Sequence, residues 1–240
     1  YLAFCKARRT VSAAIHSAAT CGTMAVCRLS APSHLPLIMK KIYAAALSVL
    51  FVASTPWATS AMAADAEVET LVSERCATCH GAKGHSTSPI FPSLAGQNQE
   101  YLVKQLQDFR SKKRASDTMA PQAADLSDAN IAGLAAFFAG QPAKVQRVSD
   151  TELVAVGRYI YTKGNTWSGV PACTSCHGDK AYGTATLPRL AGQNMRYLLS
   201  QLKDFNLRTR NNDNEAMHLV ASRLTEMETQ AVADYLAQLP

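Results

Sequence analysis

Cys76-Ala77-Thr78-Cys79-His80-Gly81 and Cys173-Thr174-Ser175-Cys176-His177-Gly178 are the two stretches that decide how this chain folds. Both follow the pattern C-x-x-C-H-G, and they lie 97 positions apart. A second motif, Pro-x-Leu-Ala-Gly-Gln-Asn, recurs at an offset of 96, at residues 92–98 and 188–194. Single positions recur at nearly the same spacing: Tyr101, Gln105, Asp108, Phe109 and Met119 return as Tyr197, Gln201, Asp204, Phe205 and Met217. Repetition on this scale predicts two similar structural units.

Each unit is predicted to be helical. Apolar residues keep helical spacing near residues 101–109 and 197–205, and no alternating strand pattern of useful length occurs. Ser127 and Thr225 are expected to begin the last helix of each unit, and Glu228 completes a capping box with Thr225. The predicted fold class is all-α, with two tandem domains at residues 64–140 and 151–240. A polar, helix-breaking linker is expected at 141–150.

The residues before the first domain are interpreted as a leader. Lys40 and Lys41 precede a short apolar run, and Ala61-Met62-Ala63 matches a secretory cleavage site, so residues 39–63 are predicted to be a signal peptide. The run is shorter than the roughly 20 residues that span a bilayer. Residues 1–38 are interpreted as upstream sequence outside the native protein. We therefore expect an exported, periplasmic protein.

The charge distribution argues against a nucleic-acid-binding protein. The formal net charge is +6, but it arises entirely from the leader, whose cations have no acidic residue beside them: Lys6, Arg8, Arg9, Arg28, Lys40 and Lys41. The remaining 18 basic residues balance the 18 acidic ones. The predicted mature chain therefore lacks the basic surface that nucleic acids require.

C-x-x-C-H is the attachment signature of c-type haem. Two thiols on one helical turn can form thioethers with the two vinyl groups of one porphyrin, and the adjacent His then lies beneath the iron. The predicted attachment residues are Cys76, Cys79, Cys173 and Cys176, with His80 and His177 as iron ligands. A zinc ribbon is disfavoured because the motifs belong to separate repeats. A thioredoxin-like redox pair would need a βαβ setting.

An electron-transferring haem needs a second axial ligand, and the thioether of Met is the usual partner of His. Met119 is the only Met between the two motifs. Three Met follow the second motif, and only Met217 aligns with Met119 in the repeat. We predict that Met119 and Met217 complete the iron coordination, with a role as core filler as the alternative. His218, beside Met217, is a rival ligand without a counterpart in the first unit.

Pro92 and Pro188 follow the two histidines by twelve and eleven residues. A ligating His normally donates its other ring N–H to a nearby acceptor. The backbone carbonyls of Pro92 and Pro188 are the predicted acceptors, with plain turn prolines as the alternative.

Together these motifs resemble the two-domain class I cytochromes c of the c-four type, over nearly all of residues 66–240. The resemblance implies two cytochrome c folds, each wrapped around one covalently bound haem c. It implies an electron carrier between a quinol–cytochrome c reductase and a terminal oxidase, with no catalytic residue. It also implies a small residue where the first and last helices of a domain cross. Gly157 fills that place in the second unit, whereas the first unit carries Glu69 there.

Two other functions stay open. The alternative to a soluble carrier is the cytochrome subunit of a sulfide-oxidising flavocytochrome or a similar dehydrogenase, because such subunits share this tandem fold. Peripheral association with a membrane is also compatible with the sequence. A dihaem peroxidase is disfavoured because it needs an open iron site. Of the remaining residues, Trp167 and Tyr182 are expected to pack near the second haem. The basic run at residues 112–114 is expected to be solvated, with attraction of an acidic redox partner as the alternative.

Overall fold

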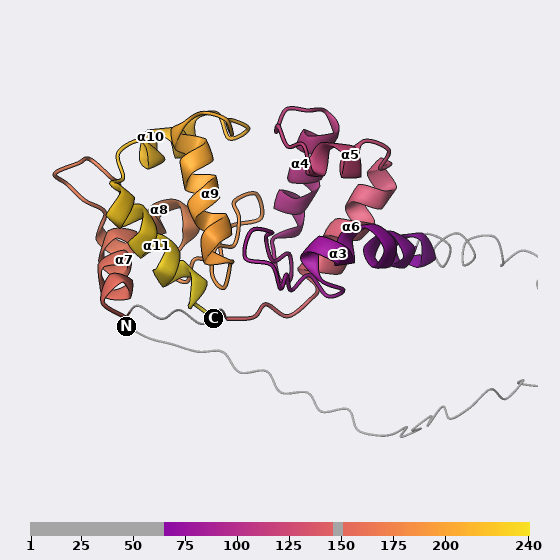
Figure 1. Cartoon of the computed structure of the whole chain (residues 1–240), viewed down its shortest axis with the longest axis horizontal. Coiled ribbons are helices and arrows are strands. Elements are labelled where there is room, and N and C mark those ends of the chain that lie inside the picture. Colours follow the sequence, from indigo (N-terminus) through magenta and orange to yellow (C-terminus); the bar gives the residue numbers. More distant parts are fainter. Residues whose placement is uncertain (1–64, 146–150) are drawn as a thin grey trace, which may run out of the picture. The chain divides into compact units, whose positions relative to one another are not determined.

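The structure of the chain is a computed structural model that describes residues 65–145 and 151–240 (Figure 1). The two ranges belong to one compact unit. They are called here the first domain (65–145) and the second domain (151–240). The interpretations of residues 1–38 and 39–63, and half of the expected linker, lie outside the described residues. Within them, every helix is too short or too polar to cross a membrane.

Both domains are built from helices joined by loops. In the first domain, residues 65–71 are helical and lead into the π-helical turn η1 (Val72–Cys76) and α3 (Ala77–His80). They are followed by α4 (Gln99–Arg110), α5 (Met119–Ala123) and α6 (Asp128–Ala139). The second domain contains α7 (Thr151–Lys163), α8 (Thr174–His177), α9 (Met195–Asn206), α10 (Ala216–Ala221) and α11 (Glu226–Ala237). The described residues form no strand beyond one isolated bridge between Asn165 and Val170. The all-α prediction is confirmed.

The last helix of each domain begins at the residue expected from the sequence. The hydroxyl of Ser127 accepts a hydrogen bond from the backbone N–H of Asn130, and Oδ1 of Asn130 accepts one from the N–H of Ser127. Thr225 and Glu228 form the same reciprocal pair at the start of α11. A capping box supplies partners for backbone N–H groups that have none within the helix. Both helix starts are therefore fixed locally.

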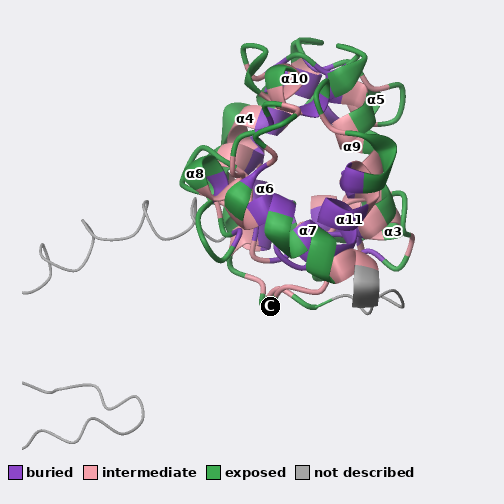
Figure 2. Ribbon diagram, turned by 90° about the vertical axis from the view of Figure 1, so that its left-hand side faces the viewer, coloured by how far each residue is buried: buried purple, intermediate pink, exposed green. Residues whose placement is uncertain are grey.

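Each domain has its own apolar core. The first core gathers buried side chains from residues 65–76, α4 and α6, including Val72, Phe109, Ile131 and Phe138. The second combines α7, α9 and α11, including Ile160, Leu198, Val232 and Leu236. Figure 2 shows that buried residues dominate α11, whereas the outer side of α7 is exposed. Domains this small bury little apolar surface on their own.

The first and last helices of each domain cross at a glycine, but on different helices. In the second domain, a Cβ on Gly157 of α7 would lie 1.8 Å from the carbonyl oxygen of Ala231 in α11. In the first domain, a Cβ on Gly133 of α6 would lie 2.4 Å from Cγ2 of Val68. Glu69 is exposed, so the sequence alignment that placed Glu69 at the crossing was wrong by one residue. A glycine on the partner helix makes room for Val68.

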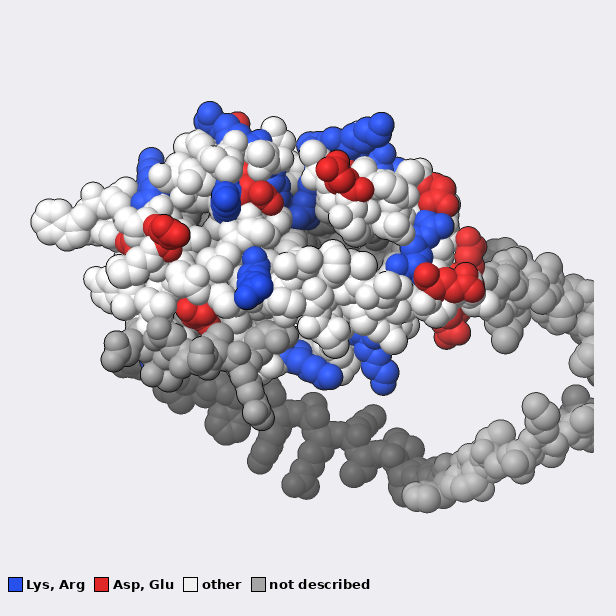
Figure 3. Space-filling model, viewed as in Figure 1, with Lys and Arg blue, Asp and Glu red and all other residues white. Residues whose placement is uncertain are grey.

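Surface charges of both signs are interspersed. Figure 3 shows lysines and arginines scattered among acidic residues on one face, with large uncharged areas between them. This distribution agrees with the balance of charges expected for the chain after the leader.

Candidate haem sites

In the described part of the molecule, a cavity of about 1350 Å³ is lined by residues of both C-x-x-C-H motifs. This volume exceeds the roughly 300–1,000 Å³ of ordinary small-molecule pockets. The structure brings all ten predicted site residues to its wall: Cys76, Cys79, His80, Pro92, Met119, Cys173, Cys176, His177, Pro188 and Met217.

The four cysteines are free thiols on short helical turns. Cys76 ends η1 and Cys79 lies in α3, while Cys173 and Cys176 lie at the start and within α8. Burial raises the pKa of Cys76, and it raises that of Cys173 to about 11. Thiols that act in redox exchange or as zinc ligands are typically those with lowered pKa values. The raised pKa values of these two thiols are therefore unlike those of typical redox or zinc cysteines.

The two histidines are buried and directed by backbone carbonyls. His80 is 6% exposed, and its Nδ1 lies 2.9 Å from the carbonyl oxygen of Pro92. His177 is 8% exposed, with a longer distance of 3.4 Å to the carbonyl of Pro188. Burial lowers the pKa of both imidazoles, and the carbonyl contact partly opposes it. A neutral imidazole that donates through Nδ1 presents the lone pair of Nε2 to a metal.

The two methionines are positioned by short helices with different caps. Met119 begins α5, and its N–H donates to the hydroxyl of Ser116 at 3.0 Å. Met217 is the second residue of α10, and its N–H donates to Oδ2 of Asp213 at 2.7 Å. Asp213 Oδ1 is buried and has no hydrogen-bond partner among the described residues. The loops are thus equivalent in role, but only the second places a partly buried carboxylate, that of Asp213, beside the methionine.

His218 and His85 lie outside this cavity wall. The Nδ1 of His218 is 3.0 Å from the carbonyl oxygen of Phe205, so the ring is directed toward α9. This placement gives Met217, and not its neighbour, access to the cavity.

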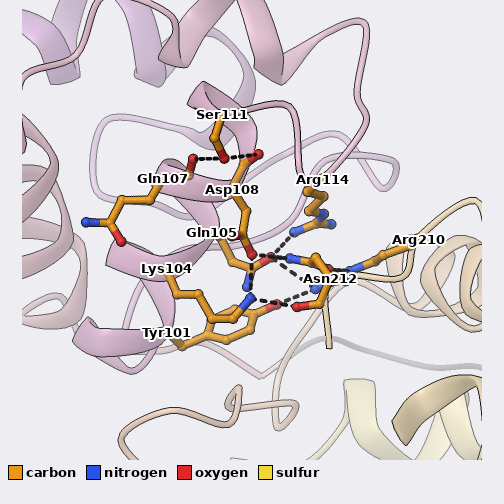
Figure 4. A network of polar contacts seen from close by, with 9 residues as sticks. All are labelled: Tyr101, Lys104, Gln105, Gln107, Asp108, Ser111, Arg114, Arg210 and Asn212. Atoms are coloured by element: carbon orange, nitrogen blue, oxygen red, sulfur yellow. Dashed lines mark hydrogen bonds and ion pairs between the residues drawn. The ribbon is translucent and has the colours of Figure 1, made fainter. Parts of the chain in front are cut away.

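A polar cluster between the domains also lines the cavity (Figure 4). Arg114 donates to Gln105 of its own domain at 2.8 Å and to Gln201 of the other at 2.6 Å. Arg210 donates to the same two glutamines, at 3.2 Å and 2.7 Å. Asn212 joins the cluster through Asp108 at 2.6 Å. Arg114 and Arg210 are 7% and 8% exposed, and none of the ion pairs of the described residues includes either.

The structure corrects two sequence interpretations. The basic run at residues 112–114 is solvated at Lys112 and Lys113, but Arg114 is buried between the domains. Its repeat relation to Arg210, at the same offset of 96 as Tyr101 and Tyr197, was the overlooked signal. Trp167 does not pack near the second site: its side chain is 97% exposed. Tyr182, the other aromatic residue expected near the second haem, is 40% exposed, and the guanidinium carbon of Arg189 lies 4.1 Å from the centre of its ring.

These residues fit a haem group in each domain. A flat apolar cofactor needs a large cavity with apolar walls. The thiols that attach it and a neutral imidazole that binds its iron must lie on the wall of the same cavity. Buried guanidiniums without ion-pair partners also suit a ligand that carries carboxylates, because an unpaired buried charge is costly. Two small helical domains with these groups around one cavity define a c-type cytochrome with two haems.

Comparison with known proteins gives the same result. The model of the cytochrome c family matches twice, at residues 66–163 and 154–240. The chain is 43% identical over 168 residues to cytochrome c4 of Thiocapsa roseopersicina, a match that covers 68% of this chain and 86% of that relative. The chain therefore belongs to the cytochrome c family, and within it to the dihaem proteins of the cytochrome c4 type. It carries two covalently bound haem c groups and transfers electrons.

Two further relatives are informative. The crystal structure of reduced cytochrome c4 from Pseudomonas stutzeri superposes with a TM-score of 0.68 at 33% identity, covering 75% of this chain and 98% of that one. A protein of Stutzerimonas stutzeri named thiosulfate dehydrogenase electron acceptor is 39% identical over 171 residues, covering 68% of this chain and 78% of its own length.

Proposed function

We propose that each domain holds its haem through the residues that its own motifs supply. The first haem is attached through Cys76 and Cys79, with His80 and Met119 as axial ligands of the iron. The second is attached through Cys173 and Cys176, with His177 and Met217 as axial ligands. The placement of both imidazoles and both thioethers on the wall of one large cavity supports this assignment most directly.

The neighbouring residues prepare these ligands. The carbonyls of Pro92 and Pro188 accept from Nδ1 of the imidazoles, which fixes the ring orientation and increases the basicity of Nε2. Ser116 and Asp213 hold the backbone at the two methionines. Arg114 and Arg210 are proposed to pair with the haem carboxylates. The haem irons supply reversible one-electron chemistry, and two protein ligands on each leave no open position for a substrate.

Spectra of the purified protein test the ligands. We expect both ferric haems of the native protein to be low-spin and to show the far-red Met-to-iron band. Met119→Ala and Met217→Ala should each remove about half of that band, because one of the two iron–thioether bonds is lost. Met195→Ala is the matched control, since Met195 packs against the second core and lies outside the cavity wall. An unchanged band in both ligand variants would refute the assignment.

For the cellular role, we propose a periplasmic carrier that receives electrons from a quinol–cytochrome c reductase and passes them to a terminal oxidase. Export would depend on the signal peptide expected at residues 39–63. On the face shown in Figure 3, charges of both signs are interspersed, which supports brief contacts with several partners over one tight electrostatic complex.

A dehydrogenase is the second candidate for the electron donor. The likeness to the thiosulfate dehydrogenase electron acceptor favours an enzyme that oxidises thiosulfate, and a sulfide-oxidising flavocytochrome remains the other candidate of this class. Stopped-flow reduction of the purified cytochrome by each enzyme with its substrate separates them. The physiological donor should reduce both haems at near-diffusional rates. Fast reduction by a dehydrogenase together with slow reduction by the quinol–cytochrome c reductase would overturn the respiratory assignment.

A further inference from the structure

Gln97 and Gln193 end the repeated Pro-x-Leu-Ala-Gly-Gln motif and are both buried, at 6% exposure. Neither is among the predicted ligands of a haem. Each side chain accepts one hydrogen bond from its own domain, from the N–H of the following asparagine. Its other hydrogen bonds reach the loop that carries the proline of the other domain.

Gln193 of the second domain brackets the backbone of Ser93 in the first. Its Oε1 accepts from the N–H of Ser93 at 2.8 Å, and its Nε2 donates to the carbonyl of Ser93 at 2.9 Å. The next residue, Asn194, donates to the carbonyl of Phe91 at 2.6 Å. The second domain therefore holds the backbone on both sides of Pro92.

The same arrangement recurs in the opposite direction. Gln97 of the first domain accepts from the N–H of Arg189 at 2.7 Å and donates to its carbonyl at 2.8 Å. Asn98 donates to the carbonyl of Leu187 at 2.6 Å. Pro188 is thus held on both sides by the first domain, as Pro92 is held by the second.

A proline carbonyl depends on such neighbours. The carbonyl of Pro92 shares its planar peptide group with the N–H of Ser93, so the hydrogen bond from that N–H to Oε1 of Gln193 fixes the direction of the carbonyl. The peptide group before Pro92 has no N–H, and the bond from Asn194 to the carbonyl of Phe91 holds it instead. The direction of the Pro92 carbonyl is then set by the residues before and after it, and those residues are fixed by Gln193 and Asn194. This carbonyl is the acceptor for Nδ1 of His80.

We infer that Gln193 and Asn194 are positioning residues for the first haem, and that Gln97 and Asn98 are positioning residues for the second. Each domain orients the proximal histidine of the other. This inference rests on the proposed assignment of His80 and His177 as iron ligands. A proximal His that donates a good hydrogen bond is a more basic ligand and stabilises the ferric state. Loss of the hydrogen bonds from one of these glutamines should therefore raise the reduction potential of the haem in the opposite domain.

The matched variants Gln193→Leu and Gln97→Leu test this inference. Each haem can be followed separately by NMR through its own axial Met signals, assigned with Met119→His and Met217→His variants. Gln193→Leu should favour the reduced form of the first haem by about threefold to tenfold, which corresponds to about 30–60 mV for one electron. Gln97→Leu should act on the second haem, with a smaller effect because the contact of His177 to Pro188 is the longer one.

A second readout is direct. The exchange of the Nδ1 proton of His80 with solvent should accelerate in Gln193→Leu and stay unchanged in Gln97→Leu. Residues that merely join the domains would change both haems alike, or would lower the melting temperature while leaving the potentials unchanged; either result overturns the inference. Absence of axial His or Met signals in the native protein would instead refute the proposed ligands, so the two failures are distinguishable.

Discussion

The guanidinium of Arg114 in the first domain donates to the hydroxyl of Tyr197 in the second, at 3.1 Å. The repeat counterparts make the reciprocal contact: Arg210 donates to the hydroxyl of Tyr101 at 3.0 Å. Both guanidiniums also lie over a phenylalanine of their own domain, at 4.6 Å and 4.4 Å from the ring centres. The two domains are therefore joined by buried polar groups that hydrogen-bond to one another, although neither guanidinium has an ion-pair partner among the described residues.

Replacement of Arg114 by Met should weaken the junction between the domains. The hydroxyl of Tyr197 would lose its partner and Gln201 would lose one of its donors, so we expect the free energy of unfolding to fall by about 1–3 kcal/mol. Denaturant unfolding of the haem-containing protein measures this loss. Arg208→Met is the control, because the ion pair of Arg208 with Glu215 is exposed and should contribute at most about 1 kcal/mol. Equal losses in the two variants would contradict the expectation.

Gly157→Ala should destabilise the second domain strongly. The new methyl group would lie 1.8 Å from the carbonyl oxygen of Ala231, so α7 and α11 must separate. Overpacking of this kind costs about 1–3 kcal/mol or more, and thermal unfolding should show a lowered melting temperature. Gly140→Ala serves for comparison, because φ there is −74° and the nearest atom is at an ordinary 3.4 Å. A tolerated Gly157→Ala would show that the crossing is not close-packed.

The capping box of α11 should make stability depend on pH. Burial by itself raises the pKa of Glu228, but hydrogen bonds from the N–H of Thr225, from Asn165 and from the hydroxyl of Thr225 outweigh it, and the pKa is lowered. A carboxyl with a lowered pKa stabilises the fold above its unfolded value of about 4.3, and this contribution disappears as the pH falls through the folded value.

Glu228→Gln should therefore be less stable than the native protein at pH 7, by about 1–2 kcal/mol, and nearly equal to it at pH 3. Denaturant titrations at both values give the comparison. Glu226→Gln, in the same helical turn but exposed, should change stability by less than about 1 kcal/mol. A difference that persists at pH 3 would exclude the carboxylate as its source.

Asp213→Asn should raise the reduction potential of the second haem. With Met217 as the proposed iron ligand, the carboxylate that caps it favours the ferric state, whereas the first domain has the neutral hydroxyl of Ser116 in this role. Removal of one nearby charge should shift the equilibrium by on the order of tenfold, or about 59 mV. Asparagine can still accept from the N–H of Met217. Spectroelectrochemical titration provides the measurement, and Glu215→Gln, an exposed carboxylate two residues away, should have a much smaller effect.

Much of this structure could be predicted from local patterns. The capping boxes at Ser127 and Thr225 and the helical apolar spacing depend on residues close in sequence, and so α4, α6, α9 and α11 could be predicted from them. The repeated motifs also identified all ten candidate site residues from the sequence alone. Their assignment as haem ligands remains a proposal.

The interface could not be predicted in this way. Arg114 looked like part of a solvated basic run, because its partners lie in another domain and no local pattern reveals them. The partners of the motif glutamines Gln97 and Gln193 also lie in the other domain, so no local pattern indicates their role. Trp167 was expected to pack near the second haem. Backbone hydrogen bonds between Asn165 and Val170 instead hold its loop so that the ring is exposed to solvent.

The glycines at the two helix crossings imply that the first helices of the two domains are not interchangeable. A chimera that places the α7 segment before the first domain would set Gly157 opposite Gly133 and leave a void between two helices without side chains. The converse exchange would press Val68 against the backbone of Ala231. Although the halves descend from one repeated pattern, each first helix now fits only the last helix with which it is encoded.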